Sequence, residues 1–232
     1  MDTNSNKYTF IYASVMVILV AALLSLAATI LKPYQDNNVK IEKMQYILRS
    51  VNLDVEASEA EKVFEETIVE SYIVDTKGNK QSGEAFNVDL KVERTKAAEE
   101  MQLPVYIAKV ADNKIRYIIP IRGAGLWGPI WGYVALNDDR QTIYGAIFDH
   151  QGETPGLGAE IAAPSFQEQF KGKEIFDANG AYANFVVAKT GEKAAIQSSV
   201  DAISGGTITS KGVEAMLAAD LKLYQEFFKN LR

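Results

Sequence analysis

The chain has 232 residues, of which 47% are hydrophobic, and its formal net charge is −6. This length suits one domain with a substantial core plus an appendage, and the acidic charge gives no reason to expect a nucleic-acid partner. With no cysteine and only one histidine, His150, the chain cannot hold disulfides, thiolate metal sites, cysteine-bound iron–sulfur clusters, a cysteine nucleophile or a multi-histidine metal site.

The first predicted element is a transmembrane helix over residues 8–31, preceded by a short tail of residues 1–7. No charged residue occurs between Lys7 and Lys32. A helix of that length measures roughly 36 Å, which exceeds the roughly 30 Å hydrocarbon core of a bilayer. A cleaved signal peptide is the alternative, but its apolar region normally has only about 7–15 residues. The pattern therefore favours an uncleaved, single-pass anchor in the lipid bilayer.

The charges flanking this segment leave its orientation open. Lysines and one arginine follow the span, whereas only Lys7 and the amino terminus precede it. A simple count of positive charges would place the large domain in the cytoplasm. That count is unreliable here, because long domains translocate largely regardless of charge.

An amphipathic connector is predicted over residues 32–55, followed by a folded domain over residues 56–232. Within the connector, apolar residues recur at helical spacing between Ile41 and Asn52. Residues 56–67 are also predicted to be helical, and residues 75–100 to form loop and short helix.

The remainder of the domain is predicted to consist of strands and one closing helix, Ile208–Leu231. The predicted strands are Thr67–Val74, Leu103–Val110, Lys114–Arg122, Trp131–Asn137, Thr142–Asp149, Tyr182–Lys189 and Ala195–Val200. The turn residues Ala111-Asp112-Asn113 and Asp138-Asp139-Arg140 indicate hairpins. Because strands come in hairpins and do not alternate with helices, we expect an α+β fold with a mainly antiparallel sheet, flanking helices and one N-terminal transmembrane helix.

A candidate phosphate site lies before the closing helix, in the sequence Asp201-Ala-Ile-Ser204-Gly205-Gly206-Thr207. Small residues let another molecule approach the backbone closely. A helix start supplies unpaired N–H groups and a partial positive charge, which suit a phosphate, and a threonine hydroxyl can be esterified by one. The alternative is an ordinary capped helix, since serine and threonine commonly cap helices and glycine commonly precedes them.

A second candidate segment, His150 to Glu160, follows a predicted strand. Pro155-Gly156 favours a type II turn, and Gly158 adds conformational freedom. One interpretation is a plain connecting loop. The other is a ligand loop that brings Glu153 and backbone amides up to a flat aromatic ligand, with Glu153 accepting from a ring N–H. Glu160 is an alternative cap for the next segment.

Three aromatic residues have competing interpretations. Trp127 and Trp131 fit a sheet core, although Trp127 lies between two glycines and is also placed to lie against a ligand ring. His150 is interpreted as a hydrogen-bonded structural residue, because no Gly-x-Ser-x-Gly nucleophile motif accompanies it. No catalytic residue is predicted in this chain.

Taken together, these features resemble a known family, the C subunit of the sodium-translocating NADH:quinone reductase. The resemblance covers nearly the whole chain and keeps the family's order of motifs. Those motifs are the single span, Gly125-Leu126-Trp127-Gly128, His150-x-x-Glu153-Thr154-Pro155-Gly156-Leu157-Gly158-x-Glu160-Ile161, and Asp201-x-x-Ser204-Gly205-Gly206-Thr207.

The resemblance implies FMN esterified through its phosphate to Thr207, attached by a separate flavin transferase that uses FAD and a magnesium ion. Gly206 stands where the family pattern usually has alanine. Thr209 and Ser210 are competing hydroxyls, and Lys211 is expected to add positive charge near the phosphate. The expected cofactor-binding residues are Thr207, Ser204, Gly205, Gly206, Lys211, Glu153, Thr154, Pro155, Gly156, Leu157, Gly158 and Trp127, and no metal ligand is expected.

The resemblance also implies a place in a larger complex of the bacterial inner membrane. The large domain would be periplasmic, and the B, D and E subunits, with A and F, would be partners. The protein would take electrons from an iron–sulfur centre and pass them to a flavin in the B subunit, while the complex couples quinone reduction to sodium export. The alternatives are the related G subunit of an Rnf-type ferredoxin:NAD oxidoreductase, and an anchored module that binds a small anion without flavin.

Overall fold

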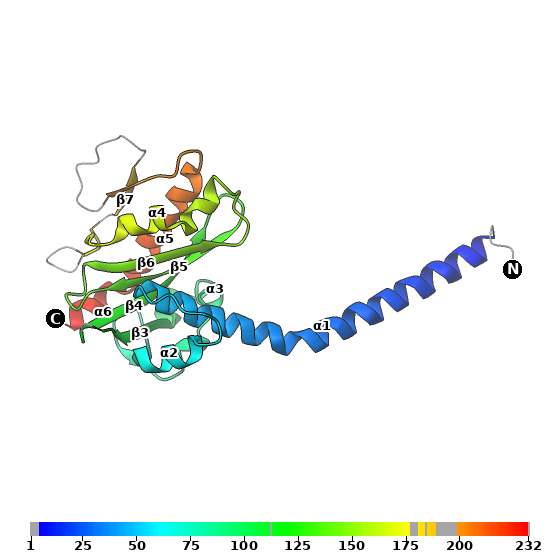
Figure 1. The fold of residues 1–232 in the computed structure, drawn as a ribbon, viewed down its shortest axis with the longest axis horizontal. Coiled ribbons are helices and arrows are strands. Elements are labelled where there is room, and N and C mark those ends of the chain that lie inside the picture. The colour runs from blue at the N-terminus through cyan, green and yellow to red at the C-terminus, as the bar shows by residue number, and fades with distance from the viewer. Residues whose placement is uncertain (1–4, 112, 177–180, 184, 189–198, 232) are drawn as a thin grey trace. The chain divides into compact units, whose positions relative to one another are not determined.

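An antiparallel sheet with strand order β2-β1-β3-β4-β5-β6 forms the centre of the fold (Figure 1). The computed structural model describes residues 5–111, 113–176, 181–183, 185–188 and 199–231. The strands are β1 (Ile68–Val74), β2 (Lys80–Gln81), β3 (Leu103–Lys109), β4 (Ile115–Ala124), β5 (Pro129–Leu136) and β6 (Ile143–His150). The α+β fold with a mainly antiparallel sheet is thereby confirmed, and so are five of the predicted strands, within two residues at each end.

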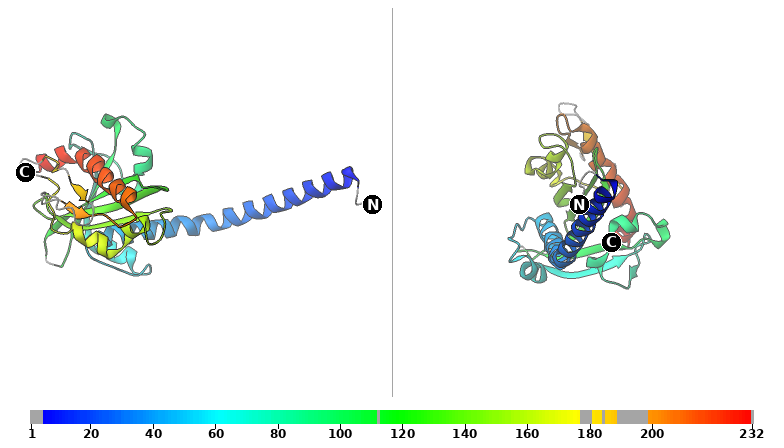
Figure 2. Two further views of the ribbon diagram at one scale, coloured as in Figure 1. Left: turned by 90° about the horizontal axis from the view of Figure 1, so that it is seen from above. Right: turned by 90° about the vertical axis from the view of Figure 1, so that its right-hand side faces the viewer.

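Both faces of the sheet are covered over β3 to β6, which explains why these four strands are mostly apolar and buried. Adjacent residues of one strand belong to different hydrophobic cores, one on each face of the sheet. In β4, Ile119 faces one core and Ile118 the other; in β5, Val134 and Tyr133 are divided in the same way. Side chains alternate between the faces of a strand, so a strand buried on both sides needs apolar residues at every position. Figure 2 shows helices on opposite sides of the sheet.

The larger core lies between the sheet and the C-terminal helices α5 (Thr207–Leu223) and α6 (Gln225–Asn230). The prediction of one continuous closing helix is wrong, because the helix is interrupted at Tyr224. The Tyr224 side chain is 1% exposed, and its hydroxyl donates to the Pro104 carbonyl of β3 at 3.0 Å. Burial of this one tyrosine beneath β3 accompanies the break.

Short helical segments close the same core beside β6. They are η3 (Gly158–Ala162), α4 (Pro164–Gln167) and η4 (Glu168–Phe170). Phe166 and Phe170 pack edge-on against Phe148 of β6, and Phe170 also stacks on Phe185. This aromatic cluster anchors the segment that follows the predicted ligand loop.

The smaller core covers the opposite face and includes the last turn of α1 (Asn6–Ser50) and the helix α2 (Ala60–Thr67). The region predicted as a helix over 56–67 is helical only from Ala60, and Ala60 itself is fully buried. In the last turn of α1, Ile47 and Leu48 are fully buried.

Helix α1 joins two segments that were predicted separately, the span and the connector. It passes through Pro33 without ending, although proline removes one helical hydrogen bond. By contacts the chain forms two compact units, Met1–Lys43 and Met44–Arg232. By length and composition α1 is able to cross a membrane, and none of the residues in its most apolar stretch is buried. The structure therefore fits a single membrane anchor.

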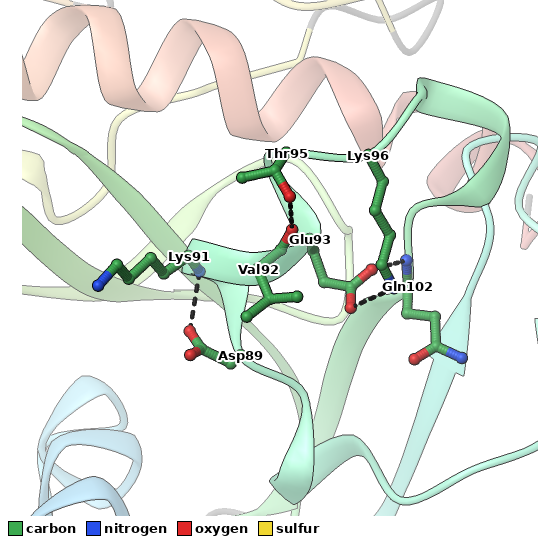
Figure 3. Close-up of polar contacts among 7 residues, drawn as sticks. All are labelled: Asp89, Lys91, Val92, Glu93, Thr95, Lys96 and Gln102. Atoms are coloured by element: carbon green, nitrogen blue, oxygen red, sulfur yellow. Dashed lines mark hydrogen bonds and ion pairs between the residues drawn. The ribbon is translucent and has the colours of Figure 1, made fainter.

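The segment between β1 and β3 folds into β2, η1 (Ala85–Asn87), α3 (Leu90–Glu93) and η2 (Ala98–Glu100), in keeping with the predicted loop and short helix. Figure 3 shows the buried Glu93 carboxylate at its centre. Glu93 accepts from the Lys96 ammonium at 2.7 Å and from the backbone amide of Gln102 at 2.8 Å. These contacts fasten the segment just before β3 begins.

Two further strands, β7 (Val186–Ala188) and β8 (Ser199–Asp201), pair in parallel. They coincide with parts of the predicted strands Tyr182–Lys189 and Ala195–Val200; the rest of both predictions lies partly outside the described residues. The parallel pairing was not predicted. β8 leads directly into the candidate phosphate segment.

Helix α5 lies against β4 at very close range. A Cβ on Gly212 would lie 2.4 Å from the Ala124 carbonyl oxygen, so only glycine fits without a shift of the backbone. This contact fixes the start of α5 relative to the β4–β5 turn.

We expect Gly212→Ala to lower the free energy of unfolding by about 1–3 kcal/mol through overpacking, although alanine has the higher helix propensity by about 1 kcal/mol. Urea unfolding of the full chain in detergent measures this. The control is Ala215→Gly on the exposed face of α5, which loses only the propensity difference. A neutral or stabilising Gly212→Ala would contradict the close contact.

Candidate functional site

A pocket of about 270 Å³ lies where three segments of the chain meet. The turn between β4 and β5 contributes Leu126 and Trp127. The loop after β6 contributes Glu153, Thr154, Leu157 and Gly158, and the start of α5 contributes Gly205 to Thr209. The two segments singled out in the sequence therefore lie together, although more than forty residues separate them along the chain.

The start of α5 has no side-chain cap. The chain turns at Ile203–Gly206, where the Gly206 amide donates to the Ile203 carbonyl at 3.0 Å and Gly205 has φ +73°. Gly206 is the N-cap residue, and no side-chain oxygen caps the helix. The alternative of an ordinary helix capped by serine or threonine is therefore wrong. The first amides of α5 lack intrahelical acceptors, and Gly206 and Thr207 line the pocket.

The three hydroxyls at the start of α5 differ in their surroundings. Thr209 is 1% exposed and donates to Glu153 Oε2 at 2.6 Å. Ser210 is fully buried, donates to the Gly206 carbonyl at 2.9 Å and accepts from the Ile203 amide at 3.1 Å. Thr207 is half-buried and lines the pocket, and its hydroxyl has no hydrogen-bond partner in the described part of the chain. Of the three hydroxyls in the first turn of α5, it is therefore the one that no described residue engages.

Gly206 is explained by the space around it. A Cβ at this position would lie 2.9 Å from the Leu157 carbonyl oxygen and 2.9 Å from Ile203 Cγ2. In this chain the loop after β6 therefore approaches α5 too closely for alanine to fit without a small shift.

The loop after β6 has the predicted turn. The Leu157 amide donates to the Thr154 carbonyl at 3.1 Å, and Gly156 has φ +75°, as a type II turn requires. Glu160 accepts from the Gly156 amide at 3.0 Å. His150 Nδ1 accepts from the Glu153 backbone amide at 3.2 Å, so His150 is hydrogen-bonded, as expected.

The Glu153 carboxylate is 4% exposed and holds the three segments together. Oε1 accepts from the Trp127 amide at 2.8 Å, and Oε2 accepts from the Thr209 hydroxyl. Burial acts to raise the pKa of Glu153, but hydrogen bonds from Thr209, Trp127 and Gly128, with the charge of His150, outweigh it and lower the pKa. Both oxygens therefore already have a donor within the protein, and the expectation that Glu153 also accepts from a ligand ring stays a prediction.

Four large apolar side chains surround the mouth of the pocket. Trp127 is 70% exposed, Ile208 61%, Leu126 49% and Leu157 42%. The interpretation of Trp127 as a core residue is therefore wrong, whereas Trp131 is half-buried. An exposed apolar cluster beside a helix start suits a ligand with a flat ring and an anionic group.

Four of the predicted site residues do not line the pocket: Ser204, Pro155, Gly156 and Lys211. The Lys211 ammonium forms an ion pair with Glu214 at 2.8 Å. Its expected contribution to binding a phosphate stays a prediction. Leu126 and Ile208 also line the pocket but were not predicted as site residues. Each is an apolar residue next to a predicted site residue, Trp127 or Thr207, and this position could have indicated them. Thr209 was predicted only as a competing hydroxyl. In the described residues, no cluster of histidine, aspartate or glutamate side chains is arranged to hold a metal ion.

The segment that contains the pocket matches a known protein family. Residues 125–222 match the family model described as FMN-binding domain. Over 234 residues the chain is 32% identical to the C subunit of the Na(+)-translocating NADH-quinone reductase of Neisseria meningitidis serogroup B, covering 94% of this chain and 90% of that protein. It is 31% identical to the protein of the same name from Vibrio anguillarum, covering 92% and 89% respectively.

Solved structures show the same fold. The crystal structure of the C subunit of the Na(+)-translocating NADH-quinone reductase from Parabacteroides distasonis is 48% identical, with a TM-score of 0.80, and the match covers 85% of this chain and 96% of that chain. The structure of Shewanella oneidensis NqrC is 27% identical, with a TM-score of 0.70, covering 84% and 98%.

The lowered pKa of Glu153 gives a prediction on acid stability. A carboxyl whose folded-state pKa lies below its unfolded value stabilises the fold above about pH 4.5, its ordinary pKa, and this contribution is lost as the pH falls through the folded-state pKa. We expect Glu153→Gln to cost about 1–3 kcal/mol near neutral pH and progressively less below pH 4.5. Urea unfolding of both full-length proteins across this range measures the difference. A difference that does not change with pH would contradict the assignment.

Proposed function

Because the chain belongs to the family formed by the C subunits of Na(+)-translocating NADH-quinone reductases, we propose that it is the membrane-anchored flavoprotein subunit of such a complex. In this proposal it relays electrons through FMN joined by its phosphate to Thr207. The oxidoreductase activity belongs to the whole complex, and this chain supplies one of its redox centres.

One observation carries the proposal: Thr207 offers the free hydroxyl at an uncapped helix start, inside a pocket. Every residue that lines this pocket falls within 125–222, the segment that matches the FMN-binding domain. The neighbouring hydroxyls of Thr209 and Ser210 are both buried and hydrogen-bonded. Thr207 is therefore the residue to which the phosphate attaches.

The start of α5 suits the charge of the attached phosphate. A phosphodiester keeps one negative charge, which the first free amides of a helix and its dipole stabilise. The Gly206 amide is already used by Ile203, so the amides of Thr207, Ile208 and Thr209 are the ones that remain for this role.

The rim of the pocket suits a ring that stays partly in contact with solvent. A volume of about 270 Å³ lies just below the roughly 300–1,000 Å³ of pockets that enclose small ligands. Trp127, Ile208, Leu126 and Leu157 would cover the lower part of the ring and leave an edge accessible. Such an edge suits electron exchange with another protein of the complex.

FMN supplies reversible electron transfer, which a polypeptide without cysteine lacks. The chain's own residues bind the phosphate, orient the ring and keep the cofactor from being lost. We further propose that electrons come from an iron–sulfur centre of neighbouring membrane proteins and pass to a flavin in the B subunit, in a complex that exports sodium. A flavin transferase using FAD and magnesium would attach the FMN. The anchor would lie in the bacterial inner membrane, with the large domain in the periplasm.

Attachment at Thr207 is tested by producing the full chain together with a flavin transferase. We expect covalent yellow-green fluorescence after denaturing electrophoresis, and complete loss of it in Thr207→Ala. Mass mapping of peptides should find FMN on Thr207 and on neither Thr209 nor Ser210. FMN found on Thr209, or fluorescence that persists in Thr207→Ala, would contradict the assignment.

The periplasmic location is tested with single cysteines, for which this cysteine-free chain is well suited. Ser82→Cys lies at an exposed position of the folded unit, and Asn6→Cys lies before the apolar run. A membrane-impermeant maleimide added to intact spheroplasts should label Ser82→Cys and reach Asn6→Cys only after lysis. The reverse pattern would place the domain in the cytoplasm.

A further inference from the structure

We propose that Glu153 is a positioning residue for flavin attachment. By holding the Thr209 hydroxyl, it fixes the first turn of α5 so that Thr207 presents its hydroxyl to the pocket. This inference rests on the proposed function, because it concerns how one hydroxyl among several comes to receive the FMN phosphate.

The contacts of Glu153 join parts of the chain that are far apart in sequence. Its Oε1 accepts from the Trp127 amide at 2.8 Å, in the turn between β4 and β5. Its Oε2 accepts at 2.6 Å from the hydroxyl of Thr209, which follows 56 residues later. Thr209 lies two positions after Thr207, on the same helical turn. A displacement of the carboxylate would therefore move both walls of the pocket.

The hydrogen bonds to the Glu153 carboxylate come from neutral donors, the Trp127 backbone amide and the Thr209 hydroxyl. No lysine or arginine forms an ion pair with it in the described part of the chain, whereas the equally buried Glu93 pairs with Lys96 at 2.7 Å. Burying a carboxylate without an ion pair is costly. The two oxygens of Glu153 accept from different segments at once, so the carboxylate fixes the positions of these segments relative to each other.

The surrounding glycines leave room for this carboxylate. A Cβ on Gly125 would lie 2.5 Å from Oε1, and a Cβ on Gly158 would lie 2.3 Å from Oε2 and 2.5 Å from the Thr209 hydroxyl oxygen. Neither glycine has a positive φ, so each is required for space and not for backbone conformation. Two segments of the chain are thus built closely around the hydrogen bond between Glu153 and Thr209.

The geometry separates the hydroxyls by reactivity. In the attachment step the Thr207 oxygen bonds to the flavin-side phosphorus of FAD, the pyrophosphate bond breaks, AMP leaves, and the hydroxyl proton passes to the transferase. The Thr209 hydroxyl is 1% exposed and donates a hydrogen bond to Glu153, so it cannot reach that phosphorus. The same hydrogen bond keeps the Thr207 side of the turn at the pocket.

The test measures the initial rate of covalent flavin incorporation into the purified full chain in detergent, with transferase, FAD and magnesium. Thr209→Val keeps the shape of the side chain but removes the hydroxyl. We expect it to slow incorporation at Thr207 tenfold or more, within the roughly hundredfold loss that a displacement of about 1 Å can cause. Thr209→Ser keeps the donor and should restore the rate to within about twofold of the wild-type rate.

Glu153→Asp provides the second arm, because it keeps the charge but is too short to reach both segments. We expect a loss similar to that of Thr209→Val. Ile119→Val, which removes a methyl group from the buried core of β4, is the control for lowered stability and should load normally. Thr209→Val or Glu153→Asp loading at the wild-type rate would overturn the inference, as would a slow Thr209→Ser. A wild-type chain that acquires no flavin at Thr207 would instead refute the proposed function.

Discussion

The site depends on one buried hydrogen-bonded group, the carboxylate of Glu153. It accepts from the backbone of the β4–β5 turn and from the Thr209 side chain of α5, while its own backbone belongs to the loop after β6. These three segments also form the walls of the pocket. Because buried polar groups are costly when left unpaired, each segment is constrained by the other two. The free hydroxyl of Thr207 is a consequence of this arrangement.

The sheet and its helices provide the frame in which that contact forms. Gly212 lets α5 approach β4 closely, and further along the helix Asp220 accepts from the Arg122 amide of β4 at 2.6 Å and from the Arg94 side chain. Burial raises the pKa of Asp220, although its hydrogen bonds with Arg94 oppose this. Helix α5 is therefore fixed to β4 at two points along its length, and these contacts hold its first turn beside the pocket.

Local features of the sequence predicted much of this structure. Hairpin turns and apolar strands indicated the antiparallel sheet, and the pair Pro155-Gly156 correctly indicated a turn with positive φ at Gly156. Tertiary contacts could not be predicted in this way. The helix break at Tyr224 accompanies a contact between its side chain and β3. Trp127 is exposed because it lies at the tip of the β4–β5 hairpin. The internal role of Glu153 depends on a residue 56 positions away, for which no local pattern exists.

The coupling between Glu153 and Thr209 is the most direct measure of this account. A double-mutant cycle with Glu153→Gln and Thr209→Val, followed by urea unfolding of the full chain in detergent, isolates their interaction from other effects of each substitution. The account predicts a coupling free energy of about 1 kcal/mol or more at neutral pH, as expected for a buried hydrogen bond to a charged group. Additivity within about 0.3–0.5 kcal/mol, as for independent sites, would contradict it.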